Sequence, residues 1–199
     1  MFDVIVAFAG IVLTSPFAVA AAIAVKLDSD GPAIYRGARV GRDGRHFEIL
    51  KLRTMRLGAE TQGPAVTAVG DPRVTAVGRV LRRTKLDEIP QLLNVLRGEM
   101  SLVGPRPEHP DFVKLYTPEQ RHVLSVRPGI TGLATLELID EEELLAEGET
   151  VERYVGSVMP KKLALDLHYV RTATFGGDLR ILGRTVRSVV RRQFVRRAR

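Results

Sequence analysis

The sequence predicts an α+β protein that is predominantly helical, with an apolar membrane helix at its N-terminus, a small β-hairpin and amphipathic helices at a membrane surface. Three observations lead to this prediction. Residues 4–25 carry no charge. The stretch IYRGARVGRDGRHFEILKLRTM (34–55) reads as two β-strands around an Asp-Gly pair. Apolar residues recur at helical spacing in several later segments.

The composition is that of a folded protein with one sizeable core: 199 residues, of which 45% are apolar and 27% charged. There is no cysteine, which excludes disulfides and thiolate metal sites. The four histidines are scattered without a pair at ligand spacing, which argues against a zinc site. The net charge is +7, and residues 184–199 hold seven arginines and no acid, equal to the whole excess. This balance predicts an anionic partner: nucleic acid, anionic lipid or a phosphorylated ligand.

The N-terminal apolar run, residues 4–25, is long enough to cross a bilayer core of about 30 Å as a helix. A signal peptide would need a positive n-region and a shorter apolar stretch, and neither is present. A buried helix of a soluble protein is the bland alternative, but a helix of this length that is apolar on every side is rare in so short a chain. Lys26 and the cations after it indicate a cytoplasmic position for that flank.

Ser15-Pro16 lies near the middle of this run and predicts a kink, because proline removes a backbone donor and clashes with the preceding turn. The serine hydroxyl can bind the carbonyl that the proline frees. A kinked spanning helix and a helix that enters and leaves on the same side both fit this pattern. Asp3 is costly at depth, so we expect it near an interface.

Short elements and ordered loops are predicted in the middle of the chain. A basic helix is expected from Thr75 to Arg83, and a second helix from Ile89 to Leu96, where apolar residues recur at helical spacing. A further helix is expected near Pro118 to Leu124. Loops are expected at 57–73, SLVGPRPEHP (101–110) and RPGITG (127–132).

Three helices are predicted after residue 139. Residues 140–146 are acidic, and Gly148 can end their helix. The acidic run DEEE (140–143) predicts a solvated face rather than a metal site, because consecutive positions point in different directions around a helix. Pro160 can open the next helix at its first turn. The last helix starts near Asp178, and its apolar stripe between arginines predicts contact with an anionic membrane; a solvated tail is the alternative.

The densest charge cluster is RTKLDEIPQLLN (83–94), in which Asp87 and Glu88 stand among cations and before a proline. Helix capping explains part of it, because Asp87 at the N-cap would place Pro90 at N3, where no backbone donor is missed. Capping does not explain Glu88 or the surrounding cations, which are Arg82, Arg83 and Lys85. A purely structural charge network stays open as an interpretation.

Phosphoryl transfer is the functional interpretation, because it needs positive charge around the transferring group and a placed nucleophile. A helix N-terminus also attracts anions. One carboxylate can act as the nucleophile and form an acyl phosphate, while its neighbour holds Mg²⁺, which takes oxygen ligands and bridges phosphates. Candidate phosphate-binding cations are Lys51 and Arg53 on the hairpin, and Arg106, which stands between two prolines.

Several motifs resemble one family, the bacterial sugar transferases called monotopic phosphoglycosyl transferases, or polyprenyl-phosphate glycosyl-1-phosphate transferases. The most specific motifs are KLRTM (51–55), TKLDEIPQLLNVLRGEMSLVGPRPE (84–108) and RPGITGL (127–133). The Ser15-Pro16 pair, GPAIYRGARVGRDG (31–44) and KLALDLHYV (162–170) fit the same pattern. The resemblance covers nearly the whole chain, whose length is similar to the minimal catalytic form without a further transmembrane bundle.

This resemblance implies that a nucleotide-activated sugar, typically a UDP-sugar, gives its sugar phosphate to a polyprenyl phosphate such as undecaprenyl phosphate, with release of UMP. The step would begin the assembly of exopolysaccharide, capsule, O-antigen or glycoprotein glycans. The resemblance also implies that residues 1–25 form a re-entrant helix, a hairpin kinked at Ser15-Pro16, with both chain ends in the cytoplasm. A long lipid cannot leave the bilayer cheaply, since each buried CH₂ contributes roughly 0.8 kcal/mol, so the donor must meet it at the surface.

The resemblance carries specific roles onto this sequence. Asp87 would attack the β-phosphate and carry a covalent phosphosugar, and Glu88 would help to hold Mg²⁺. Lys51, Arg82 and Arg106 match family cations near the diphosphate. Asp166 matches a supporting acid.

Two departures from the family pattern stand out. Many members have a Gly-Arg-Asn stretch soon after PGITGL, where this chain reads ATLELIDEEELL (134–145), so the sequence does not name the sugar. The usual basic pair before Phe2-Asp3 is absent, so anchoring is expected to depend more on Lys26 and the C-terminal arginines.

The alternative function is a non-catalytic, membrane-associated binding or scaffold protein of a glycan assembly pathway. The intact Asp87-Glu88 pair and Arg106 argue against it. Nucleic-acid binding by the tail is disfavoured, because Phe194 is its one interleaved aromatic residue and the anchor points to lipid.

Three parts of the chain are expected: a re-entrant helix at 1–25, a cytoplasmic catalytic domain at 26–183 and a basic amphipathic helix or tail at 184–199. The expected partners are a UDP-sugar donor, a polyprenyl phosphate acceptor and membrane lipid, with no nucleic acid; a homodimer is left open. Mg²⁺ is the expected cofactor. The expected location is the inner (cytoplasmic) membrane, with the catalytic domain on its cytoplasmic face.

Overall fold

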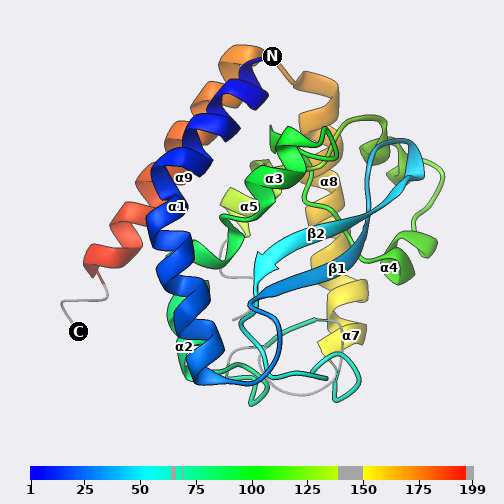
Figure 1. The fold of residues 1–199 in the computed structure, drawn as a ribbon. Helices are drawn as coiled ribbons and strands as arrows, with labels where there is room; N and C mark the ends of the chain where they lie inside the picture. Colours follow the sequence, from blue (N-terminus) through cyan, green and yellow to red (C-terminus); the bar gives the residue numbers. More distant parts are fainter. Residues whose placement is uncertain (64–65, 69, 139–149, 196–199) are drawn as a thin grey trace.

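A computed structural model describes residues 1–63, 66–68, 70–138 and 150–195. Helices surround a small amount of sheet (Figure 1). The α-helices are α1 (Phe2–Asp28), α2 (Ala76–Thr84), α3 (Gln91–Leu96), α4 (Pro110–Lys114), α5 (Leu133–Glu137), α7 (Thr150–Arg153), α8 (Met159–Thr172) and α9 (Phe175–Val195). The 3₁₀-helices are η1 (Arg42–Gly44), η2 (Leu86–Glu88) and η3 (Gln120–Ser125), and η4 (Tyr154–Val158) is π-helical. The strands are β1 (Ile34–Val40), β2 (His46–Leu52), β3 (Ser101–Val103) and β4 (Gly129–Thr131).

The β-hairpin has the predicted position and turn. β1 and β2 pair antiparallel, from Ile34 opposite Leu52 to Val40 opposite His46. Asp43 and Gly44 both adopt positive φ, at 57° and 75°, as a tight reversal between such strands requires. The predicted α+β class, mostly helical with a small hairpin and a long apolar N-terminal helix, is therefore confirmed.

The predicted loops at 101–110 and 127–132 are in part wrong. Residues 101–103 and 129–131 form two short parallel strands, β3 and β4, in which Ser101 lies opposite Gly129 and Val103 opposite Thr131. Glycine makes this approach possible, because a Cβ atom on Gly129 would lie 2.1 Å from the backbone nitrogen of Gly104. The helix predicted near residues 118–124 is a 3₁₀-helix over Gln120–Ser125.

The N-terminal segment forms one continuous helix, α1, that extends past the predicted boundary at residue 25 and contains Pro16. The axis of α1 bends part-way along the helix but does not reverse direction (Figure 1). The Ser15 hydroxyl donates to the carbonyl of Val12, 3.0 Å away, which is the carbonyl that Pro16 leaves without its helical donor. This bond confirms the predicted role of the serine; the re-entrant topology stays a prediction.

The surface of α1 excludes the alternative of a buried helix. Its mean hydropathy over the most apolar window is 2.3, yet only 6% of that window is buried. Phe8, Leu13 and Phe17 are each more than 60% exposed. Among the described residues α1 is the one helix long and apolar enough to cross a membrane. An exposed apolar surface of this size marks a site of interaction.

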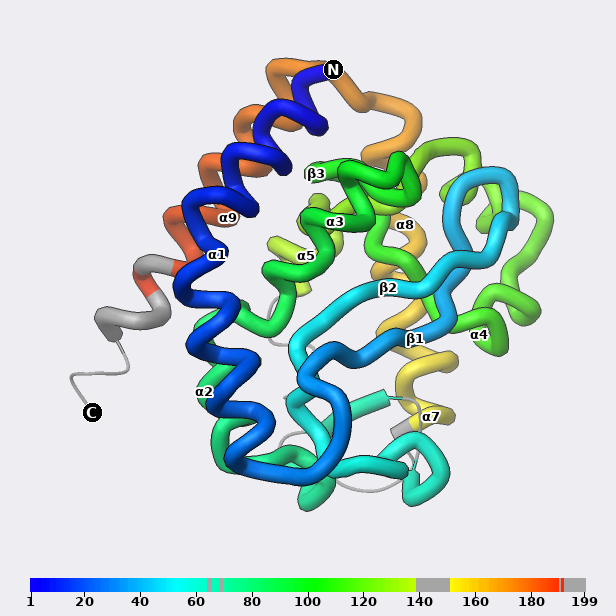
Figure 2. The backbone as a smooth tube through the Cα atoms, viewed as in Figure 1, coloured from blue at the N-terminus to red at the C-terminus, as the bar shows by residue number. Residues whose placement is uncertain are grey.

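One narrow face of α1 packs against the body of the protein along the whole helix (Figure 2). Near its start, the Ser101 hydroxyl donates to Asp3 over 2.6 Å. In its middle, Gly10 lies against Leu92 of α3. At its end, the backbone N–H of Val77 donates to Asp28 over 3.1 Å. The helix and the body are therefore joined at both ends.

The basic helix α2 confirms the prediction for residues 75–83, and its N-cap is Thr75, which accepts a hydrogen bond from the N–H of Gly78. Gly78 has no room for a side chain, because a Cβ atom there would lie 2.0 Å from the carbonyl oxygen of Thr54. This contact fixes α2 against the end of the hairpin.

We expect Gly78→Ala to lower the free energy of unfolding by about 2–3 kcal/mol, since the clash outweighs the gain of about 1 kcal/mol in helix propensity. The midpoint of thermal unfolding in detergent should fall by roughly 5–10 °C. Gly183→Ala is the matched control, because Gly183 is also helical and has open space around it. Equal effects of both substitutions would contradict the close contact.

The C-terminal helices follow the prediction in part. The acidic helix predicted at 140–146, with Gly148 and the run 140–143, lies outside the described residues. Pro160 stands in the first turn of α8, as predicted. α9 begins before Asp178, at Phe175, because Thr174 caps it: its hydroxyl accepts from the N–H of Gly177 and its carbonyl from that of Asp178.

Candidate functional site

The two predicted carboxylates lie on a sharp turn between α2 and α3. α2 ends at Thr84, and Lys85 takes a left-handed conformation with φ of 60°, which is uncommon for a residue other than glycine. Asp87 and Glu88 follow in the single turn η2. The capping interpretation is wrong, because Pro90 occupies the N-cap of α3 and no side chain caps that helix.

Glu88 is held between two cations. Its Oε1 atom lies 2.7 Å from an Nη atom of Arg106 and 3.3 Å from Nζ of Lys51. Burial alone would raise the pKa of Glu88, but the charges of Arg106, Lys51 and Lys85 outweigh it and hold the pKa well below its usual range. Glu88 is therefore ionised at any physiological pH.

Asp87 is more deeply buried than its neighbour, with 5% of its surface exposed. Its Oδ1 atom is buried without a hydrogen-bond partner. Burial raises the pKa of Asp87, Lys51 opposes this shift and Glu88 reinforces it. A buried carboxylate oxygen without a partner is costly to keep and marks a functional group.

Lys51 reaches this turn because Asn94 joins β2 to α3. Asn94 is fully buried; its side-chain oxygen accepts from the N–H of Leu50 over 3.0 Å, and its amide donates to the carbonyl of Glu48 over 2.8 Å. These bonds set Lys51 against Glu88. Burial lowers the pKa of Lys51 to about 8, although Glu88 raises it.

The structure places Arg82 beside the dyad and Arg53 away from it. The Nε atom of Arg82 donates to the hydroxyl of Thr54 over 2.9 Å, and its charge contributes to the pKa of Asp87. Arg53 follows the last residue of β2, is buried, and donates to Ser29 and to the carbonyl of Pro32. Arg53 therefore holds the chain after α1, because the carbonyls there accept its guanidinium.

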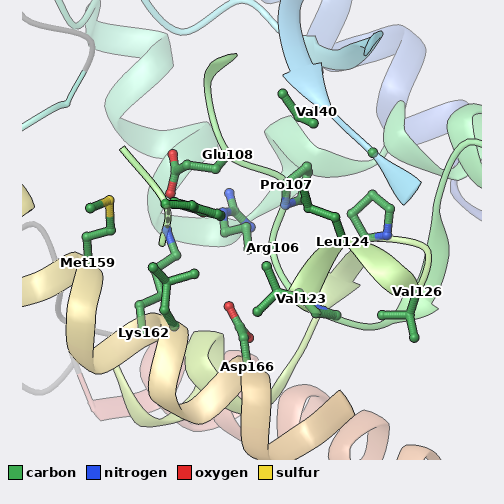
Figure 3. Close-up of a pocket in the computed structure, with 15 residues that line it drawn as sticks. Val40, Arg106, Pro107, Glu108, Val123, Leu124, Val126, Met159, Lys162 and Asp166 are labelled. Atoms are coloured by element: carbon green, nitrogen blue, oxygen red, sulfur yellow. Dashed lines mark hydrogen bonds and ion pairs between the residues drawn. The ribbon is translucent and has the colours of Figure 1, made fainter. Parts of the chain in front are cut away.

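Behind Arg106 lies a small cavity, about large enough for one water molecule, which Asp166 also lines (Figure 3). Asp166 points into it from α8, beside Lys162 and Glu108. Asp166 has 3% of its surface exposed, and its Oδ1 atom is buried without a hydrogen-bond partner. The predicted supporting acid thus lines the same small cavity as Arg106, and Glu88 is not among the residues that line it.

The dyad fits Mg²⁺, which proteins hold through one or two carboxylates together with substrate phosphates. Asp87 has a carboxylate oxygen without a partner, and the ionised Glu88 follows it in the chain. Within the described ranges, no group of three or more His, Cys, Asp or Glu side chains gathers as a closed metal site. A metal here would depend on the phosphates of a bound substrate.

A profile of the bacterial sugar transferase family matches residues 1–192. The chain belongs to the bacterial sugar transferase family. This match confirms the resemblance that the dyad and its flanking motifs predicted, and with it the predicted class of enzyme, a phosphoglycosyl transferase.

Named relatives of this sugar transferase agree with the family match. A UDP-glucose:undecaprenyl-phosphate glucose-1-phosphate transferase of Caulobacter vibrioides is 44% identical over 191 residues, covering 94% of this chain and 68% of the relative. A UDP-N-acetylgalactosamine-undecaprenyl-phosphate N-acetylgalactosaminephosphotransferase of Aeromonas hydrophila is 35% identical over 195 residues, covering 94% of this chain and 42% of the relative. The exopolysaccharide production protein PSS of Rhizobium leguminosarum bv. phaseoli is 35% identical over 202 residues, covering 96% of this chain and 94% of the relative. This sugar transferase thus spans less than half the length of the Aeromonas relative.

Sequence reasoning missed one group of polar residues in this sugar transferase. Glu108 accepts hydrogen bonds from Tyr154 and from Lys162, the latter over 3.0 Å. The partners lie 46 and 54 residues from Glu108 along the chain, so no local spacing could reveal them. The only signal was the acid at the end of the Pro-Arg-Pro-Glu stretch (105–108).

Asp166 gives this sugar transferase a pH-dependent stability. Burial raises its pKa to about 7 from the ordinary 3.8; Lys162 opposes this and Glu108 adds to it. Between these two pH values the folded state binds the proton more tightly than the unfolded chain, so stability falls as the pH rises from about 4 to 7.

We therefore expect Asp166→Asn to stabilise the protein at pH 8, by on the order of 3 kcal/mol at most, and to change stability little at pH 4. Urea unfolding at both pH values measures the difference. Asp111→Asn is the control, because Asp111 is exposed and pairs with Lys114; it should show no gain at pH 8. A gain from Asp166→Asn that is the same at both pH values would contradict the raised pKa.

Proposed function

We propose that this sugar transferase moves a sugar 1-phosphate from a UDP-sugar to undecaprenyl phosphate, with release of UMP, through a covalent intermediate on Asp87. The observation that carries this proposal is the buried, unpartnered Oδ1 atom of Asp87 beside a glutamate held by two cations. The names of the relatives supply the donor and acceptor classes. The step would begin exopolysaccharide assembly or that of a related glycan.

In the first step, a carboxylate oxygen of Asp87 attacks the β-phosphorus of the donor. A bond forms between that oxygen and phosphorus, the bond from phosphorus to the bridging oxygen breaks, and UMP leaves with the electron pair. Lys51 and Arg106, which both pair with Glu88, would stabilise the charge on the diphosphate oxygens. Mg²⁺, when held by Glu88 and Asp87, would neutralise further charge on the diphosphate.

In the second step, a phosphate oxygen of the lipid attacks the same phosphorus. The aspartyl oxygen leaves as a carboxylate, which restores Asp87 and gives the lipid diphosphate sugar. Burial of Asp87 by itself opposes this departure, because burial disfavours the charged carboxylate that is released. Lys51 beside it stabilises the restored charge.

The exposed apolar side of α1 supports a place at the inner membrane, with the body on the cytoplasmic face. The helix packs along the body over its full length, so a helix standing across the bilayer would draw α2 and α3 into hydrocarbon. Exposed arginines lie in α2 (Arg79 and Arg83) and directly after α3 (Arg97), and each costs at least about 2.5 kcal/mol at the membrane centre. A re-entrant anchor, with α9 lying on the anionic surface, avoids this cost.

This topology predicts that both chain ends stay in the cytoplasm. Cysteines introduced after Met1 and near residue 195 should resist a membrane-impermeant thiol reagent in intact cells and react after lysis. The sequence has no cysteine, so only the introduced cysteines can react with the reagent. Labelling of the N-terminal cysteine in intact cells would instead indicate a spanning helix.

UMP release tests the proposed function directly. The purified protein, in vesicles with undecaprenyl phosphate and Mg²⁺, should release UMP from at least one member of a UDP-sugar panel that includes UDP-glucose and UDP-N-acetylgalactosamine. Omitting the lipid should limit release to about one equivalent of enzyme. No release from any donor would favour the non-catalytic scaffold.

A further inference from the structure

We propose that Glu108, Tyr154 and Lys162, here called the Glu108 cluster, form a positioning unit that holds Arg106 on the catalytic dyad. The inference rests on the proposed function, in which Arg106 stabilises the donor phosphates. None of the three cluster residues contacts Asp87 or Glu88 through a described hydrogen bond or ion pair, so they would act through Arg106.

The Glu108 cluster is a closed triangle of polar contacts. The carboxylate of Glu108 accepts from the Tyr154 hydroxyl and from Nζ of Lys162, over 3.0 Å in the second case. Lys162 also donates to the Tyr154 hydroxyl over 3.0 Å and lies 5.4 Å from the centre of its ring. Figure 3 shows Lys162 reaching from α8 to Glu108, with Arg106 beside them.

The cluster fixes one end of the loop that carries Arg106. At the other end, Gly104 donates to Thr131 over 2.9 Å and Gly129 to Pro105 over 2.8 Å. At Glu108, the backbone carbonyl accepts from Val40 over 3.1 Å. Between these anchors Arg106 stands between two prolines, whose fixed φ angles transmit any shift of the loop ends to it.

The burial of the cluster argues for a positioning role over a stabilising one. The side chains of Lys162 and Glu108 are 10% and 13% exposed. A buried ion pair is weak support for stability, since apolar residues of similar volume often do as well. Burial alone would raise the pKa of Glu108, but Lys162 and the Tyr154 hydroxyl outweigh it and keep the carboxylate charged.

The backbone at Tyr154 has an unusual conformation for a plain core residue. Tyr154 opens the π-helical turn η4, between α7 and α8. Such turns are rare and are frequent at functional sites. The Tyr154 ring packs in the core, 4.9 Å from that of Phe112, where phenylalanine would suffice for packing. The hydroxyl is therefore the part that packing does not explain.

The Arg106 side chain is 24% exposed, so it can move toward solvent if the loop that carries it shifts. The cavity that Arg106 lines is only about large enough for one water molecule and could not take its guanidinium. Loss of the Tyr154 hydroxyl should let the guanidinium sample positions away from Glu88. Loss of one positioning contact of this kind typically costs roughly 10- to 100-fold in activity.

The experiment compares Tyr154→Phe with Tyr169→Phe. Both remove a buried hydroxyl that donates to a carboxylate, because Tyr169 bonds Asp178 over 2.9 Å. The Tyr169 hydroxyl also lies 3.4 Å from the carbonyl of Val103 in β3, but neither contact involves residues 105–108. The first readout is the rate at which phenylglyoxal modifies Arg106, followed by mass spectrometry of that peptide. The second is kcat/KM for the UDP-sugar, measured for each variant alone and combined with Arg106→Gln.

We expect Tyr154→Phe to speed modification of Arg106 several-fold and to lower kcat/KM roughly 10- to 100-fold, while Tyr169→Phe changes neither. In the Arg106→Gln background, Tyr154→Phe should cost little more, because both changes act through one side chain. Glu108→Gln should repeat these results if Tyr154→Phe folds poorly.

Two results would overturn the inference: unchanged modification of Arg106 in both cluster variants, or effects of Tyr154→Phe and Arg106→Gln that multiply. If the natural protein releases no UMP, the proposed function fails, and the modification rates still decide whether the cluster holds Arg106.

Discussion

Asp87→Asn is expected to abolish UMP release, by roughly 10³-fold or more, because an amide lacks the anionic oxygen that forms the bond to phosphorus. The substitution keeps the size of the side chain and removes a carboxylate whose charged form burial disfavours. The free energy of unfolding should therefore stay the same or rise. A loss of turnover without a loss of stability would place the defect in the chemistry.

The proposed covalent intermediate gives this prediction a second measurement. The natural protein, mixed with the UDP-sugar alone, should gain the mass of a sugar phosphate on the peptide that contains Asp87. Asp111→Asn is the matched control, since Asp111 is exposed on α4, and it should keep both turnover and adduct. Near-normal turnover in Asp87→Asn, or product formation without any adduct in the natural protein, would remove Asp87 from the role of nucleophile.

Glu88→Gln is expected to lower turnover by roughly 10²- to 10³-fold, because it removes the charge that Arg106 and Lys51 share and the proposed carboxylate ligand of Mg²⁺. Glu48→Gln is the control, because Glu48 lies on the same strand as Lys51 but in an exposed pair with Arg36. Titration with Mg²⁺ after treatment with EDTA should require a higher concentration in Glu88→Gln. Full activity of the natural protein in EDTA would count against a metal at Glu88.

Glu88→Gln should also change the pH dependence of activity, because Glu88 raises the pKa of Lys51. Its pKa is about 8, lowered by burial and raised by Glu88, and the amine is charged only below that value. Activity that needs this cation is therefore lost as the pH rises through about 8. In Glu88→Gln the raising effect is gone, so the loss should begin at a lower pH. An unchanged alkaline limb would show that Lys51 does not control it.

The parts of the fold that the sequence predicts are those with a local signal. Length and apolarity are enough to identify α1, and the Asp43-Gly44 pair is enough to place the hairpin turn. β3 and β4 carry no such signal, because each has three residues and their pairing joins distant segments in parallel. The sequence shows a glycine at position 129, but it does not show that this glycine packs against the backbone of Gly104.

The residues of the candidate site also divide into those with a local signal in the sequence and those without one. The dyad could be predicted because local capping rules explain at most one of the two adjacent acids and none of the surrounding cations. Lys51 and Arg106 meet Glu88 as expected, whereas Arg53, two residues after Lys51, turns to the end of α1. Residues two apart on a strand point to the same side, but β2 ends at Leu52, and the sequence spacing does not show that end. The Glu108 cluster needs three separate segments, and only the folded chain brings them together.

If α1 is the proposed membrane anchor, its fastening at both ends, through Asp3 and Asp28, decides how the enzyme and its proposed lipid acceptor would meet. A catalytic body on a loose tether could swing up and down to search for its acceptor. A body fixed to its own anchor has a constant height above the lipid, so the carrier must arrive by lateral diffusion, and the search takes place in two dimensions.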